Sequence, residues 1–94
     1  MKFDGLDWDH GNLQKCRKHG VSLEEVEYVL MNDAAFAPDL VHSGSEQRFI
    51  GVGRNRAGRP LFVAFTLRWK GGLTLVRPIS ARYMHAKEAS RYER

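Results

Sequence analysis

One apolar stretch near the carboxyl end, residues 73–83, carries three polar side chains that a fully buried strand does not tolerate. The stretch reads LTLVRPISARY, and its leucine, valine and isoleucine residues favour a β-strand. Arg77, Ser80 and Arg82 interrupt it, and an unpartnered guanidinium is too costly to bury. Pro78 has no donor for a β-ladder, so the sheet should loosen there. We therefore predict a strand whose cationic end faces an anionic ligand.

Length and composition indicate one small domain over residues 1–94. The chain is 43% hydrophobic and 28% charged, as in an ordinary globular domain with a single core. No apolar run approaches the roughly 20 residues that span a bilayer, and the first residues lack the apolar block of a signal peptide. We therefore expect a cytoplasmic protein without membrane contact. The net charge of +4 and pI near 9.6 favour nucleic acid or an acidic protein as partner, with a merely solvated basic surface as the alternative.

Helix-capping signals predict two helices joined by a tight turn. Asp9 is a good N-cap for the first helix, and Gly20 suits the left-handed residue that ends it. Ser22 and Glu25 form a capping box at the start of the second helix, which carries its glutamates on the outer side. A third, short helix is predicted at the end of the chain. The predicted helices cover residues 10–19, 23–32 and 86–92.

The remaining apolar segments are short and separated by turn residues, as in antiparallel sheets. Residues 61–69 are apolar on both sides, which predicts a central strand, whereas Pro38 indicates an edge strand or a bend. Basic residues 54–59 have the length of a hairpin loop. The predicted strands cover residues 3–8, 34–40, 47–52, 61–69 and 73–80. This order, β-α-α, then three or four meandering strands, then a helix, predicts an α+β domain with its helices on one face of an antiparallel sheet.

Several common reaction centres have no match in the sequence. The four histidines, at positions 10, 19, 42 and 85, lack the spacing of a zinc site. Ser80 lacks the glycine-flanked turn of a nucleophilic serine, and Gly51 and Gly53 lead into a turn rather than a phosphate-binding helix. Cys16 is the only cysteine, so no internal disulfide forms, and we assign the thiol no chemistry. We expect neither a metal nor a cofactor.

A group of basic and phenolic side chains remains, and it suits phosphodiester chemistry. Cleaving RNA without a metal needs a base for the 2′-hydroxyl proton, an acid for the leaving 5′-oxygen and cations for the phosphorane-like transition state. Arginine matches phosphate oxygens, and histidine or glutamate moves protons near neutral pH. The candidates are His19, Arg48, Arg77, Arg82, Tyr83, His85 and Tyr92.

Each candidate also has a purely structural interpretation. Arg48 and Arg82 can form structural salt bridges with Glu46 or Glu88. His19 can cap the end of a helix, and the last tyrosine of the chain can simply pack the final helix against the sheet.

Short sequence blocks lie at consistent spacing over nearly the whole chain. They are Phe3, Trp8-Asp9, Asn12, Lys18-His19-Gly20-Val21-Ser22, Glu25, Glu46-Gln47-Arg48-Phe49-Ile50-Gly51, Arg77, Ile79-Ser80-Ala81-Arg82, Glu88 and Tyr92. In this pattern the chain resembles the BrnT toxin family. The resemblance implies a RelE-like fold and a ribonuclease toxin of a type II toxin–antitoxin module, which blocks translation and growth.

The same resemblance implies partners and site residues. The partner is a BrnA-like ribbon-helix-helix antitoxin, through which the complex contacts operator DNA, and the substrate is RNA. The family's polar motif positions correspond here to His19, Arg48, Arg77, Ser80, Arg82, Glu88 and Tyr92.

The chain departs from the family pattern at three positions. Ala89 stands where the family has an arginine, so one phosphate or base contact is missing or comes from Arg91. Met84 replaces a small residue, and Pro78 is unusual in its strand. These departures weaken or shift the site that the resemblance implies.

Two functional hypotheses follow. The first is a metal-independent endoribonuclease that leaves a 2′,3′-cyclic phosphate and a 5′-hydroxyl. Arg48, Arg77 and Arg82 would hold the phosphate, and His19, Glu88 or Tyr92 would transfer protons. The alternative is a non-catalytic basic module of the same fold that docks an acidic antitoxin or RNA. Direct DNA binding is the weaker expectation, because the second helix is acidic and phosphates would repel it.

Overall fold

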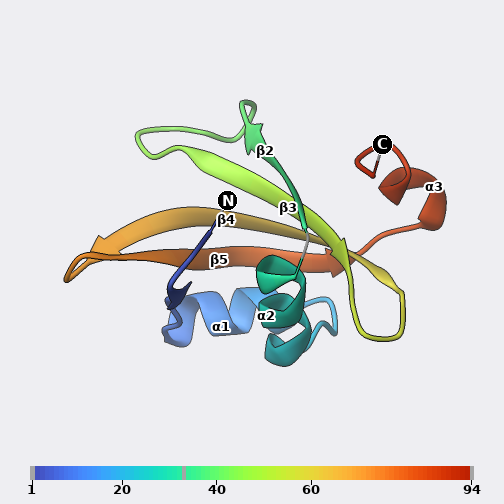
Figure 1. Cartoon of the computed structure of the whole chain (residues 1–94), viewed down its shortest axis with the longest axis horizontal. Helices are drawn as coiled ribbons and strands as arrows, with labels where there is room; N and C mark the ends of the chain where they lie inside the picture. The colour runs from blue at the N-terminus through green and yellow to red at the C-terminus, as the bar shows by residue number, and fades with distance from the viewer. Residues whose placement is uncertain (1, 33, 94) are drawn as a thin grey trace.

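The computed structural model describes residues 2–32 and 34–93, and it contains one five-stranded sheet with helices on both faces (Figure 1). The strand order is β1-β5-β4-β3-β2; β1 runs parallel to β5, and the other neighbours are antiparallel. The elements are β1 (Gly5–Leu6), α1 (His10–Arg17), α2 (Leu23–Met31), β2 (Ala35–Asp39), β3 (Arg48–Arg54), β4 (Pro60–Lys70), β5 (Leu73–Tyr83) and α3 (Ala86–Ala89). The predicted α+β class and element order are confirmed.

The first helix begins at the predicted N-cap and is also tied to the sheet. The Asp9 side chain accepts a hydrogen bond from the Asn12 amide at 3.1 Å, and the Asn12 side chain accepts one from the Asp9 amide at 2.7 Å. Asn12 is buried and also donates to the carbonyl of Pro78 at 2.9 Å. The helix ends at Arg17 rather than at residue 19, before Gly20, whose φ of +81° suits glycine.

The second helix packs closely on the sheet. Its predicted capping box is present, with Ser22 and Glu25 each accepting from the other's backbone amide at 3.1 Å. A Cβ placed on Gly51 would lie only 3.0 Å from a methyl group of Leu30, so a glycine in β3 allows this approach. The core between helices and sheet includes Val26, Val29, Leu30, Leu61, Val63, Phe65 and Val76.

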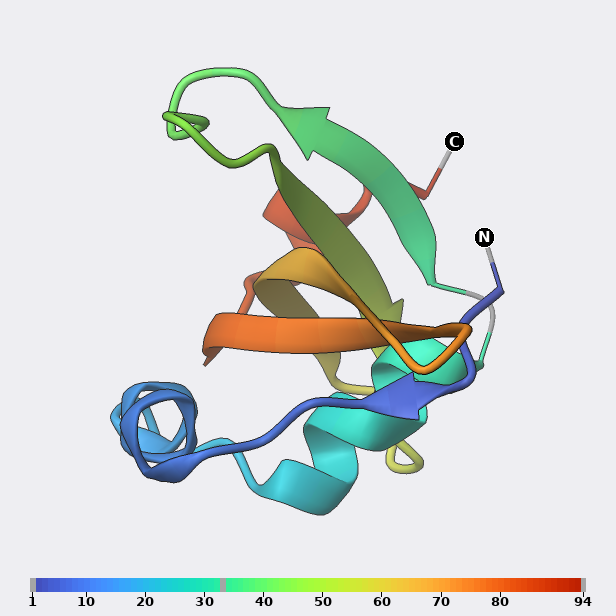
Figure 2. The ribbon, with the colours of Figure 1, turned by 90° about the vertical axis from the view of Figure 1, so that its left-hand side faces the viewer.

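The other face of the sheet is covered only at one end. Ala89, from α3, is fully buried there with Met84 and Val52, and Ile50 and Phe62 pack against them. Side chains alternate along a strand, so this small core lies on the face opposite α1 and α2 (Figure 2). The expectation that all helices share one face is therefore wrong for α3, because its apolar residues need cover of their own.

Strand β5 contains a bulge beside Pro78, which is the loosening expected there. The ladder pairs Ser80 and Pro78 with consecutive residues of β4 and skips Ile79. Residues 77 and 82 are five apart and would point to opposite faces of a regular strand. The extra residue shifts the alternation, so Arg77, Ser80 and Arg82 all lie on the same face.

Several element boundaries differ from those predicted. Strand β1 has two residues instead of the predicted range 3–8, because only these pair with β5. Strand β5 continues beyond residue 80 to its end at Tyr83, and β3 extends to Arg54. Helix α3 has four residues, and irregular turns follow it. Trp69, predicted in a central strand, is 72% exposed because β4 runs beyond the helices.

Candidate functional site

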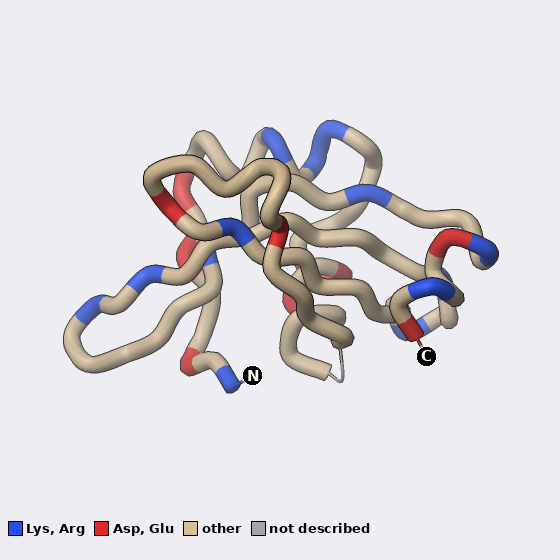
Figure 3. The backbone as a smooth tube through the Cα atoms, turned by 90° about the horizontal axis from the view of Figure 1, so that it is seen from above, with Lys and Arg blue, Asp and Glu red and all other residues tan. Residues whose placement is uncertain are grey.

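Side-chain alternation places arginines from three neighbouring strands on the face of the sheet that α1 and α2 leave uncovered, which we call the open face. Figure 3 marks the Lys and Arg positions along the backbone. Arg48 comes from β3, Arg68 from β4, and Arg77 and Arg82 from β5. All four are half-buried. Ser80 lies between the last two and pairs in the ladder with a residue of β4. The open face therefore offers guanidinium groups that water or a ligand can reach.

Arg82 forms a two-point contact with Glu88. Its two terminal nitrogens donate to the two carboxylate oxygens at 3.0 and 2.9 Å, and its guanidinium lies 4.5 Å from the ring centre of Phe62. The hydrogen bonds from Arg82 hold the pKa of Glu88 below its usual value, so the carboxylate is ionised at neutral pH. The predicted pairing of Arg82 with Glu88 is confirmed. Ala89, next to Glu88, is fully buried and offers no phosphate contact.

Arg77 connects the open face to the first helix. A terminal nitrogen of its guanidinium lies 2.7 Å from a carboxylate oxygen of Asp9, the N-cap of α1. This hydrogen bond is the main reason that the pKa of Asp9 lies below its ordinary value. One carboxylate thus caps a helix and orients a cation.

The predicted ion pair between Arg48 and Glu46 is wrong. Glu46 instead pairs with Arg68 from the neighbouring strand. Within residues 2–32 and 34–93, Arg48 has no carboxylate partner, and only its backbone amide bonds to a side chain, the hydroxyl of Ser43. Its guanidinium therefore remains available to a ligand.

The remaining candidates do not converge on one point. His19 is exposed in the turn between α1 and α2, and no described hydrogen bond connects it to the other candidates. Tyr92 is 38% exposed in the turns after α3, and His85 is the N-cap of that helix. Tyr83 faces the helices, where its hydroxyl donates to Glu25. Of the proton-transfer candidates, Glu88 alone contacts an open-face arginine in the part of the chain that the structure describes.

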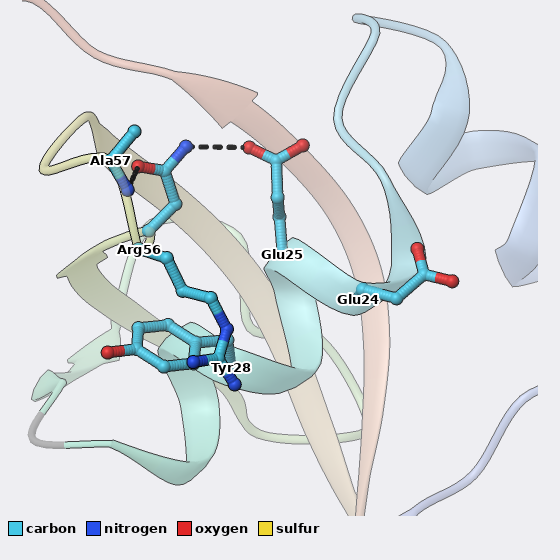
Figure 4. A pocket seen from close by; sticks show the side chains of 6 residues that line it. Glu24, Glu25, Tyr28, Arg56 and Ala57 are labelled. Atoms are coloured by element: carbon cyan, nitrogen blue, oxygen red, sulfur yellow. Dashed lines mark hydrogen bonds between the residues drawn. The ribbon is translucent and has the colours of Figure 1, made fainter.

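Glu25 is the centre of a polar cluster on the helix side, not the surface residue that was expected. Its carboxylate accepts hydrogen bonds from Tyr83 at 2.8 Å, from Asn55 at 2.8 Å and from the Ser22 amide at 3.1 Å. Figure 4 shows Glu25 facing the loop that carries Arg56 and Ala57. The guanidinium of Arg59 stacks on Tyr83 at 3.6 Å. We call Glu25, Ser22, Asn55 and Tyr83 the Glu25 cluster. It borders an open hollow of about 230 Å³.

Hydrogen bonding decides the ionisation of the Glu25 cluster. Partial burial acts to raise the pKa of Glu25, but hydrogen bonds from Asn55, Ser22 and Tyr83 outweigh it and leave the pKa below its ordinary value. The same contact with Glu25 raises the pKa of Tyr83. Tyr83 is therefore a neutral hydrogen-bond donor that joins β5 to α2, and not a proton acceptor on the open face.

Two cations that the sequence interpretation overlooked also border the open face. Arg68 lies in the strand that was predicted to be apolar on both sides, and Lys15 was not among the candidate residues. Both line one hollow together with Arg48 and Arg77. Arg68 interrupts an apolar run as Arg77 does, so the sequence already indicated that its guanidinium is not part of the core. Lys15 gave no such signal, because its position depends on how α1 packs against β5.

Other classes of site were also considered over the described ranges. No helix there is both long and apolar enough to cross a membrane, and no three or more His, Cys, Asp or Glu side chains gather as a metal site would require. Cys16 is fully buried, and burial raises the pKa of its thiol to about 11. Its predicted role as an inert core residue agrees with this position.

Comparison with known proteins relates the chain to a family. A family model described as ribonuclease toxin, BrnT, of type II toxin-antitoxin system matches residues 8–88. A search of curated proteins gave no match. The matched span includes the candidates from His19 to Glu88 and ends before Tyr92. Because the match covers most of the chain, the protein belongs to the BrnT family of ribonuclease toxins of type II toxin–antitoxin systems.

Proposed function

We propose that this toxin is a metal-independent endoribonuclease whose reaction centre is the Arg82–Glu88 pair. The observation that carries the proposal is the two-point contact between these side chains, at 3.0 and 2.9 Å, on a face with three further arginines. A guanidinium can hold a phosphate in the same two-point manner. The adjacent carboxylate is ionised and can accept a proton.

The proposed reaction needs one base, one acid and a cation. Glu88 takes the proton of the 2′-hydroxyl, and the 2′-oxygen attacks phosphorus while the bond to the 5′-oxygen breaks. The 5′-oxygen leaves with a proton supplied by Tyr92, so the products are a 2′,3′-cyclic phosphate and a 5′-hydroxyl. When phosphate replaces Glu88 on Arg82, the carboxylate loses its cation and its pKa rises toward that of a useful base. Arg82 then balances the charge of the transition state.

The other candidates have supporting roles in this proposal. Arg48 and Arg77 hold the RNA backbone, and Ser80, between the two β5 arginines, donates a hydrogen bond to it. His19 is assigned no proton transfer, because it lies in the turn between α1 and α2. Arg91 is exposed beside Glu88. It makes the contact of the family's arginine, whose position is occupied here by Ala89.

The partner of a type II toxin is an antitoxin, and we infer a BrnA-like ribbon-helix-helix protein that contacts operator DNA for the complex. Acidic side chains of the antitoxin would complement the chain's net charge of +4. Inhibition follows if these side chains cover the open face and exclude RNA. A toxin that acts on messenger RNA works in the cytoplasm.

The test of this function is RNA cleavage by purified protein in EDTA. The parent should cut RNA with or without the chelator, and Arg82→Ala should lower kcat by about 10²- to 10³-fold, as expected for removal of a transition-state donor. Arg17→Ala, an exposed arginine of α1, is the matched control and should cut normally. Cleavage that requires a metal, or an Arg82→Ala protein as fast as the parent, would disprove the mechanism.

A non-catalytic binding module remains the second candidate, and one observation favours it. Arg77 and Arg82 are already paired with Asp9 and Glu88. Internal carboxylates therefore neutralise part of the positive charge of the free protein. Expression of the chain alone in a bacterium separates the two functions. Growth arrest with loss of messenger RNA supports the enzyme, whereas normal growth at the same protein level supports the binding module.

A further inference from the structure

The open face has a second cationic region, distinct from the Arg82–Glu88 pair. It is a hollow of about 340 Å³ bordered by Lys15 from α1, Arg48 from β3, Arg68 from β4 and Arg77 from β5. We call the space that these four residues border the cationic hollow. Thr66 and Ile79 also line it, whereas Arg82 and Glu88 do not.

Cations outnumber carboxylates in this region. Glu46 is the single carboxylate among the described residues that line it, and it pairs with Arg68. Arg77 is paired outside the hollow with Asp9. Neither Lys15 nor Arg48 has a carboxylate partner in residues 2–32 and 34–93. Gathering like charges from four elements raises the local positive potential and attracts an anion.

The position of the hollow along β5 indicates which part of a ligand reaches it. A strand rises about 3.3 Å per residue, and the ladder partners of Arg77 and Arg82 in β4, Thr66 and Phe62, are four residues apart. The backbones of Arg77 and Arg82 are therefore roughly 13 Å apart. Both side chains are held by carboxylates that lie away from each other, Asp9 at α1 and Glu88 at α3. One phosphate bound at Arg82 therefore leaves the hollow vacant for another.

We propose that the cationic hollow binds a second phosphate of single-stranded RNA, separate from the phosphate that reacts at Arg82. The inference rests on the proposed function, because it takes Arg82 as the reacting end. Lys15 and Arg48 make the direct phosphate contacts, since no carboxylate competes for them. Arg68 and Arg77, already paired, add long-range attraction. The hollow thus fixes the register of the strand and makes cleavage depend on RNA length.

The salt dependence of binding tests this proposal without any cleavage. The probe is a 2′-O-methylated RNA of about ten nucleotides, within the range that such grooves bind, and the measurement is Kd by fluorescence anisotropy between roughly 50 and 200 mM salt. Each single-strand phosphate contact contributes about 0.7 to the slope of log K against log salt. Lys15→Gln and Arg48→Gln should each reduce the slope by about that amount.

Lys18→Gln is the matched control, because Lys18 is an exposed lysine at the end of the same helix and does not line the hollow. It should keep the slope of the parent. Unchanged slopes for Lys15→Gln and Arg48→Gln would overturn the proposal, and thermal melts establish that all variants are folded. If these two variants bind RNA normally but lose a co-expressed antitoxin, the hollow is a protein-binding site and the proposal is wrong.

A short probe distinguishes a second phosphate from the reacting one. A 2′-O-methylated dinucleotide has a single phosphodiester, which should bind at Arg82, so Lys15→Gln should leave its Kd unchanged. A weaker Kd would mean that the hollow holds the only phosphate and would overturn the inference. Failure of the proposed function is separate: it appears as full cleavage by Arg82→Ala, whatever the slopes of the hollow variants.

Discussion

The Glu25 cluster and the cationic hollow lie on opposite faces of the same sheet and use similar residue types in different ways. In the Glu25 cluster one carboxylate receives hydrogen bonds from α2, the β3–β4 hairpin and β5. In the cationic hollow four cations from four elements border a space with one carboxylate. The first arrangement satisfies the hydrogen-bonding capacity of its carboxylate internally, and the second has a surplus of positive charge that attracts an external anion.

Internal pairing, rather than burial, separates the two clusters, because the members of the Glu25 cluster and the arginines of the hollow are all half-buried. In the Glu25 cluster, Ser22, Asn55 and Tyr83 all donate to the same carboxylate. On the open face, water solvates Lys15 and Arg48, the two cations of the hollow without a carboxylate partner among the described residues, so leaving them unpaired costs little. A charged cluster with complete internal pairing therefore stabilises the fold. One with unpaired cations on an uncovered face is available for binding.

Between these two clusters, the largest expected effect is on RNA cleavage by a variant of the cationic hollow. Arg48→Ala should lower kcat/KM by about 10- to 100-fold, because a charged hydrogen bond to phosphate contributes roughly 1.5 to 3 kcal/mol. Its free energy of unfolding should change by less than about 0.5 kcal/mol, since no ion pair is lost. Arg56→Ala, an arginine that stacks on Tyr28 on the helix side, is the control for cleavage. A large loss of stability in Arg48→Ala would contradict the distinction between the two faces.

The next effect is on stability, and it comes from the helix side. Glu25→Gln should lower the free energy of unfolding by about 1 to 2 kcal/mol, because a charged acceptor of three hydrogen bonds becomes a neutral one. Cleavage by the folded variant should equal that of the parent. Glu24→Gln removes the same charge from the same helical turn at an exposed position and isolates the contribution of the contacts. Urea unfolding measures the stability of Glu25→Gln and of Glu24→Gln. Equal unfolding midpoints for the two variants would refute the stabilising role of the contacts to Glu25.

The smallest expected effect is the pH dependence of the difference in unfolding free energy between the parent and Glu25→Gln. The pKa of Glu25 in the folded state lies below its ordinary value of 4.5, so its contribution to stability is fully present above about pH 4.5. The contribution is lost as pH falls through the folded pKa, because folding then requires release of a bound proton. The stability gap between parent and Glu25→Gln should therefore shrink as pH falls below about 4.5. A constant gap would show that the charge of Glu25 is irrelevant.

Local signals in the sequence predicted most of the elements. Ser22 and Glu25 determine where α2 begins, since a capping box involves four adjacent residues. Pro38 predicted the edge position of β2, and the apolar run before Trp69 predicted the central position of β4; both are confirmed. Each of these features depends on a few neighbouring residues, so the sequence contains the information directly.

The site required long-range information. Alternation along a regular strand would place Arg77 and Arg82 on opposite faces, and the bulge that unites them arises where β5 pairs with β4. Glu46 lies near Arg48 in the chain yet pairs with Arg68, because neighbouring strands bring distant residues closer than sequence neighbours. Lys15 joined the hollow only through the packing of α1 against β5.

By itself, the sequence determined the α+β element order, the helix caps and the resemblance to the BrnT family, because these depend on local patterns and on blocks in a fixed order. The tertiary structure alone decided which charges meet. It placed Glu25 inside a hydrogen-bonded cluster, set α3 on the face opposite the other helices, and gathered four cations around one hollow. The physical reason is that an ion pair depends on distance in space, and sheet register and helix packing determine that distance.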